Sequence, residues 1–125
     1  MFKQFLFLLT VCFIMMSCYK PQNLDIAVNG QVSDQNNKGV ANVTIYINRG
    51  KSESIWPVSY DKYDSVFTNS AGKYSYLITD YKYRYEVCCK IPSQYSGVDQ
   101  FCKKVDQSII DGKTIPNTIN FKLTP

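Results

Sequence analysis

Short stretches in which apolar and polar side chains alternate constrain this chain more than any other feature of its sequence. A period of two places successive side chains on opposite faces of a β-strand. Turn-forming residues separate the stretches, which recur at roughly ten-residue spacing as in β-sandwiches. The sequence therefore predicts an all-β fold, a seven-stranded antiparallel β-sandwich. The expected strands cover residues 26–32, 43–48, 64–68, 73–78, 81–91, 101–105 and 115–123.

The longest expected strand, 81–91, carries tyrosines on one face and cations on the other. Its segment Tyr81-Lys82-Tyr83-Arg84-Tyr85 mixes aromatic and basic residues as single-strand nucleic-acid binders do. Period two separates the two kinds, which favours tyrosines in the core and a solvated basic face. In the last strand, we expect Ile119, Phe121 and Leu123 to point inward.

The N-terminal segment has the pattern of a cleaved signal peptide. Lys3 precedes an apolar run over residues 5–16, and about twelve apolar residues are too few for a membrane span that needs roughly twenty. The following Met15-Met16-Ser17-Cys18 resembles the lipobox of bacterial lipoproteins, with Met15 where Leu is commoner. We therefore expect a signal peptide over 1–17, a lipid on Cys18, a tether over 18–24 and one domain over 25–125. The alternative is an ordinary secretory signal, with Cys18 an incidental thiol.

Charge and composition exclude several classes of function. The mature chain keeps 13 of the 14 basic residues against 10 acidic ones, without a polybasic block, so a nucleic-acid partner is not expected. The sequence contains no histidine, which excludes Ser–His and Cys–His nucleophiles and imidazole metal ligands. Asp61 and Asp64 could act as a general acid and base only in a cleft that perturbs their pKa values. We expect no catalytic residue, no metal and no cofactor.

Residues 34–39 superficially resemble a calcium loop, but Lys38 occupies a ligand position, so a turn is expected.

The cysteines allow one disulfide in an oxidising compartment. Cys12 leaves with the signal and Cys18 takes the lipid, so three remain. Cys88 and Cys102 both fall on polar faces of consecutive strands, where a hairpin would bring them side by side. This parity predicts the pair Cys88–Cys102 and leaves Cys89 as a buried thiol. The rival pair, Cys89–Cys102, needs a β-bulge.

Three segments carry a family resemblance. They are Ile26-Ala27-Val28-Asn29-Gly30-Gln31-Val32-Ser33-Asp34, Gly39-Val40-Ala41-Asn42-Val43-Thr44-Ile45 and Thr68-Asn69-Ser70-Ala71-Gly72-Lys73-Tyr74-Ser75-Tyr76. Together with the closing Ile119-Asn120-Phe121-Lys122-Leu123, they resemble the carboxypeptidase regulatory-like domain of the transthyretin-like (prealbumin-like) superfamily, found in Bacteroidetes-type lipoproteins. Asn69 replaces the usual Asp, and the insertion over 51–63 is longer than a minimal member needs. The resemblance implies a transthyretin-like sandwich. It also implies a non-enzymatic member, because the related hydrolase and intradiol-dioxygenase branches use histidines.

One aromatic cluster lies outside the strand pattern. Trp56, Tyr60 and Tyr63 alternate with carboxylates, and flat rings beside polar groups can stack on a sugar. The alternative is that Trp56 closes one end of the sandwich and the tyrosines cover it. Asp64-Ser65-Val66 also resembles a short O-glycosylation motif.

These observations lead to a functional expectation. We expect a non-catalytic structural or protein-interaction module, anchored in the outer membrane through the lipid and facing the periplasm, with exposure on the cell surface as the alternative. Its partner would be an unidentified envelope protein or glycan. A carbohydrate-binding accessory using Trp56, Tyr60 and Tyr63 is the second hypothesis, and an enzyme without histidine is the third.

Overall fold

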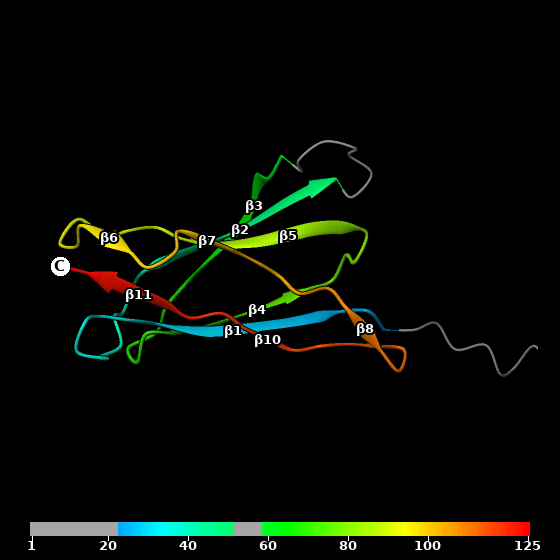
Figure 1. Cartoon of the computed structure of the whole chain (residues 1–125), viewed down its shortest axis with the longest axis horizontal. Coiled ribbons are helices and arrows are strands. Elements are labelled where there is room, and N and C mark those ends of the chain that lie inside the picture. The colour runs from blue at the N-terminus through cyan, green and yellow to red at the C-terminus, as the bar shows by residue number, and fades with distance from the viewer. Residues whose placement is uncertain (1–22, 52–58) are drawn as a thin grey trace, which may run out of the picture.

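The computed structural model of the chain describes residues 23–51 and 59–125 (Figure 1). The expected signal peptide, Cys18 and Trp56 lie outside the described residues. The described residues form strands and connections and no helix, which confirms the all-β prediction. None of them forms a helix long and apolar enough to cross a membrane.

The first sheet pairs the beginning of the domain with its end. Strand β1 (Ile26–Ser33) lies at its centre, with β4 (Lys73–Ile78) antiparallel on one side. On the other side lie β10 (Asn117–Thr118) and β11 (Phe121–Thr124), and β6 (Gly97–Val98) pairs with β11. The strand order is therefore β4, β1, β10 and β11, then β6.

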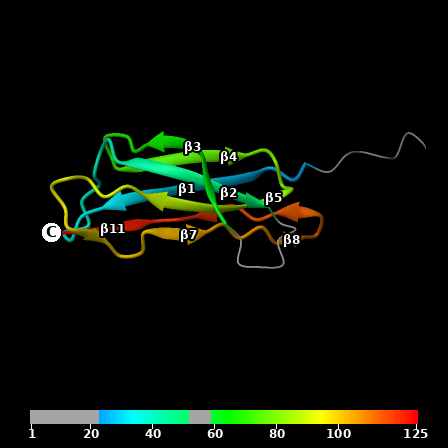
Figure 2. The same ribbon diagram turned by 90° about the horizontal axis from the view of Figure 1, so that it is seen from above.

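The second sheet has four antiparallel strands in the order β3, β2, β5, β7. These are β3 (Asp61–Phe67), β2 (Thr44–Lys51), β5 (Tyr83–Cys89) and β7 (Cys102–Lys104). Strands β2 and β5 lie over β1 in Figure 1, and Figure 2 shows the strands of both sheets running along the same long axis. The two sheets thus form a β-sandwich.

A small hairpin, not expected from the alternation, forms a separate two-stranded sheet. Strands β8 (Ile109–Ile110) and β9 (Lys113–Thr114) flank Asp111 and Gly112, whose φ angles are 52° and 74°. Positive φ at both central residues is typical of a two-residue hairpin turn, for which Asp-Gly is a preferred sequence.

Strand number and direction differ from the prediction. The described residues contain eleven strand segments rather than seven. In addition, β1 runs parallel to β10 and β11, with Val28 opposite Asn117 and Val32 opposite Phe121. The strand expected over 115–123 is interrupted between β10 and β11, and the strand expected over 81–91 is shortened to β5. Alternation specifies which face a side chain takes, but it does not specify the neighbouring strand or its direction.

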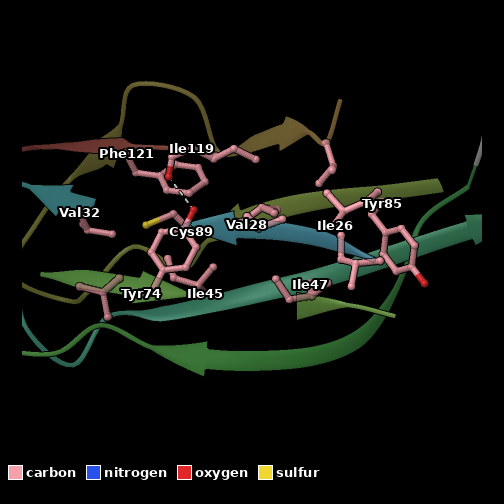
Figure 3. Close-up of a cluster of buried hydrophobic side chains, with 14 of the residues drawn as sticks. Ile26, Val28, Val32, Ile45, Ile47, Tyr74, Tyr85, Cys89, Ile119 and Phe121 are labelled. Carbon is pink, nitrogen blue, oxygen red and sulfur yellow. Dashed lines mark hydrogen bonds between the residues drawn. The ribbon is translucent and has the colours of Figure 1, made fainter. Parts of the chain in front are cut away.

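The core lies between the two sheets and is the alternating apolar set. Ile26, Val28 and Val32 of β1 are buried together with Ile45 and Ile47 of β2 (Figure 3). The inward orientation expected for the final strand is confirmed, because its three apolar side chains, Ile119, Phe121 and Leu123, are buried.

Gly30 allows a close crossing within the first sheet. It pairs with Tyr74 of β4, whose hydroxyl donates a 2.6 Å hydrogen bond to the Ile119 carbonyl oxygen on the far side of β1 (Figure 3). A Cβ atom on Gly30 would lie 1.7 Å from that oxygen. Only glycine therefore fits between the Tyr74 ring and the Ile119 backbone.

The cysteine prediction is confirmed. Cys88 and Cys102 form the disulfide, and Cys89 is a free, buried thiol. Cys88 is nevertheless almost fully buried, although it lies on the expected polar face. The Asn48 amide donates to the Cys88 sulfur at 3.2 Å, so the disulfide and its polar neighbour cover this position.

The segment 34–39 is a turn, as expected. The Asp34 carboxylate accepts hydrogen bonds from the backbone N–H groups of Asn36 and Lys38 at 2.9 and 3.0 Å. Asn37 takes the left-handed conformation, with φ of 61°. Asp34 thus supports its own loop, in the manner of an Asx-turn.

Candidate ligand-binding surface

An arginine held between two tyrosine rings lies where β2 ends and β3 and β5 begin. Arg49 follows Ile45 and Ile47 at alternate positions, so it shares their inward face beyond the last apolar layer. Its guanidinium carbon lies 4.0 Å from the centre of the Tyr63 ring and 4.3 Å from that of Tyr83. Cation–π attraction stabilises such contacts. We call these three residues the tyrosine–arginine cluster.

A β-bulge explains the position of Tyr63. Ile47 of β2 pairs with Asp64, but Asn48 pairs with Lys62, so Tyr63 is the additional residue of β3. A bulge reorients the side chain at the irregularity. The Tyr63 ring can therefore reach Arg49 while 47% of the residue remains exposed.

Two hollows lie beside the tyrosine–arginine cluster and share Tyr83. One, of about 550 Å³, is lined by Arg49, Asp61, Lys62 and Tyr63 among others. The other has the same volume and lies between the beginning of β5 and the chain after β7. We call the second one the basic hollow. Its lining includes the tyrosines Tyr60, Tyr81 and Tyr83 and the cations Lys82, Arg84 and Lys104.

The Gln107 side chain shapes the basic hollow. Its amide oxygen accepts from the backbone N–H of Tyr85 at 3.1 Å, and its amide nitrogen donates to the Tyr83 carbonyl at 2.8 Å. The side chain thus forms hydrogen bonds with the backbone of β5 beyond the end of β7. The Tyr81 hydroxyl donates to the Gln107 carbonyl at 2.7 Å. These bonds fix the wall of the hollow before any ligand enters.

Tyr85 and Tyr76 contribute hydroxyls near the same end of the sandwich. The Tyr85 hydroxyl donates to the Asp80 carbonyl at 2.8 Å, and burial raises its pKa. The Tyr76 hydroxyl donates to the Asp64 carboxylate at 2.9 Å, and burial followed by this hydrogen bond raises the pKa of Tyr76. Both tyrosines therefore remain neutral donors at physiological pH.

The structure separates the residues that the sequence grouped. Tyr60 lines the basic hollow and Tyr63 the other one, whereas Trp56 lies outside the described residues. Asp61 and Asp64 both lie exposed on β3, and Asp64 is engaged by Tyr76. Arg49 and Tyr83 were missed, although the inward phase of Arg49 after two isoleucines was a usable signal.

One group of potential metal ligands occurs among the described residues. Atoms of Glu86, Cys88 and Cys102 lie within 4.8 Å of one another. Both sulfurs belong to the disulfide, so neither is available as a thiolate. Cys89 is separate from this group, and burial, followed by the charge of Asp99, raises the pKa of its thiol to about 11.

Comparison with known proteins shows the fold alone. No family model matches the chain, and no curated protein matches it by sequence. A streptococcal ancillary pilin has a similar structure, with a TM-score of 0.52 and 13% identity over 82% of this chain and 34% of the pilin. The 3-chlorocatechol 1,2-dioxygenase of Rhodococcus opacus 1CP is similar with a TM-score of 0.51 and 10% identity over 80% of this chain and 59% of the enzyme. The chain thus spans about a third of the pilin and three-fifths of the dioxygenase.

Proposed function

We propose that this chain is a non-catalytic protein-interaction module, held on the outer membrane by a lipid on Cys18, and that it binds its partner along β3. The observation that carries the proposal is the exposure of β3. Every residue of this strand except Val66 is exposed, and β2 is its only strand partner among the described residues. Phe67, at one end of β3, is 65% exposed, and the tyrosine–arginine cluster lies at the other end.

The chemistry of this strip suits a protein partner. Tyrosine and arginine are enriched among the residues that contribute most to binding energy at protein interfaces. The cation–π contacts hold Arg49 and Tyr63 in place, which lowers the entropy lost on binding. Exposed edge strands also attract unwanted pairing, and charges on Asp61, Lys62 and Asp64 oppose it.

The fold supports this proposal without specifying a reaction. The dioxygenase named above shares the sandwich, but a fold alone does not define chemistry. The present sequence has no histidine, which disfavours the histidine-dependent sites expected of enzymatic relatives. We therefore place the function in the exposed surface of the sandwich.

Site-specific photo-cross-linking in intact cells tests the proposal. A photoreactive phenylalanine analogue replaces Phe67 in one strain and Thr118, exposed on the other sheet, in a control strain. We expect one discrete cross-linked protein from position 67 and none from position 118. Equal cross-linking from both positions, or none from 67, would refute binding along β3. Mass spectrometry of the N-terminal peptide that begins at Cys18 tests the lipid separately.

Carbohydrate binding is the second candidate, and the tyrosine-lined hollows favour it. Arg49 lies over the ring of Tyr63, yet 47% of Tyr63 remains exposed. Sugars stack on such half-exposed rings. Tyr60 in the basic hollow offers a second ring. Retention of the protein on a panel of immobilised polysaccharides, and its loss in Tyr60→Ala, would support this candidate.

A further inference from the structure

Three cations line the basic hollow. Among the lining residues that the structure describes, Lys82, Arg84 and Lys104 are basic and none is acidic. Arg84 and Lys104 are both exposed, and neither forms an ion pair with another residue of the two described ranges. In those ranges, the ion pair that does form joins Lys103 to Asp99 at 3.2 Å, away from the hollow.

One carboxylate, that of Glu86, lies on the strand beside these cations. Glu86 pairs with Lys104 across β5 and β7, but its side chain accepts a 3.2 Å hydrogen bond from the Asn48 amide. Among residues 23–51 and 59–125, the side chain of Arg84 has no hydrogen-bond or ion-pair partner, so its planar guanidinium can bind an external group. A guanidinium binds a carboxylate through two parallel hydrogen bonds, whereas an ammonium acts as a compact point charge.

Tyrosines also line the basic hollow. Tyr60, Tyr81 and Tyr83 are half-buried, and hydrogen bonds to Gln107 fix the wall that carries Tyr81 and Tyr83. A hollow of about 550 Å³ lies within the range of small-ligand sites, which is roughly 300–1,000 Å³. A tyrosine such as Tyr60 in the same hollow as an arginine and a lysine matches a sugar ring that bears an acidic group.

We propose that the basic hollow binds a carboxylated sugar unit of an acidic polysaccharide. The ring of the sugar packs against Tyr60, and its carboxylate pairs with Arg84 and Lys104. This inference rests on the second candidate function, carbohydrate binding, and adds the chemical class of the ligand. It does not depend on the protein partner proposed for β3.

Affinity electrophoresis of the mature, lipidated protein in phosphatidylcholine nanodiscs tests the proposal. The probe is polygalacturonate, and its fully methyl-esterified form is the control because it has the same sugar backbone without the charge. We expect retention by polygalacturonate alone. Arg84→Gln and Lys104→Gln should each weaken binding about tenfold, the change that accompanies loss of one charge-assisted hydrogen bond. Lys73→Gln, which removes an exposed charge from the other sheet, should have no effect.

The other outcomes distinguish failure of the acidic ligand from failure of carbohydrate binding itself. Equal retention by the methyl-esterified form would leave carbohydrate binding intact and overturn the acidic ligand. Retention by neither form would overturn both. An equal loss in Lys73→Gln would show diffuse charge attraction rather than a site.

Discussion

Replacing Gly30 with alanine should destabilise the domain by about 3–5 kcal/mol. The added Cβ would lie 1.7 Å from the Ile119 oxygen and 2.9 Å from the Tyr74 ring, so the chain between β10 and β11 must move away from β1. That movement breaks the Tyr74–Ile119 hydrogen bond and leaves a buried carbonyl without a donor, which costs about 1–3 kcal/mol. The bonds from Ile119 N–H to Asn29 and from Gln31 N–H to the Asn120 side chain add about 1 kcal/mol each.

Urea unfolding measures this loss. A decrease of that size lowers the midpoint by roughly 2 M for a domain whose m-value is about 1–3 kcal/mol/M. Gly97→Ala is the matched control, because its Cβ would meet only the rotatable Thr124 hydroxyl at 3.0 Å; we expect a change within about 0.5 kcal/mol.

A Gly30→Ala protein as stable as Gly97→Ala would refute the crossing argument. If Gly30→Ala does not accumulate, Tyr74→Phe leaves the backbone in place and removes the same hydrogen bond. We expect it to lose about 1–3 kcal/mol, and an unchanged midpoint would refute the argument equally.

Three further predictions concern other contacts. Replacing Cys88 and Cys102 together with alanine should cost about 3 kcal/mol, since the disulfide closes a loop across 14 positions; the difference from wild type should vanish under reducing conditions. Thr68→Val should cost about 2 kcal/mol in thermal unfolding and Thr68→Ser less, because the buried hydroxyl accepts from the Val43 N–H at 2.9 Å. The folded pKa of Cys89 is about 11 against an ordinary 9, so the contribution of this thiol to stability is constant below pH 9 and is lost as pH rises from 9 to 11. The loss of stability over that range should be smaller in Cys89→Ser.

The sequence predicted the strands and the disulfide for a clear physical reason. Burial of one face selects an alternating pattern, so Ile26, Val28 and Val32 identified β1 and its core face. The same parity placed Cys88 and Cys102 on one face of neighbouring strands. The face on which a side chain lies can be read from the alternation within its own strand, without knowledge of the neighbouring strands.

Other features of the fold depend on contacts between segments that are distant in the sequence. The parallel pairing of β1 with β10 and β11 leaves no mark in either segment. The place of Arg49 between two rings depends on a bulge in β3 opposite it. By contrast, the hairpin at Asp111-Gly112 had a recognisable sequence, because an Asp-Gly dipeptide favours a two-residue turn.

The pairing of β1 with β11 sets the order in which the domain can assemble. Val32 and its partner Phe121 are 89 positions apart, so a chain that emerges from the N-terminal end, from a ribosome or through a membrane channel, presents β1 long before β11. Until then, β1 has only β4 as a partner, and a two-stranded ribbon is at best marginally stable. Non-local pairing of this kind also slows folding. The chain should therefore remain extended and accessible to chaperones and translocation machinery until its last strand arrives.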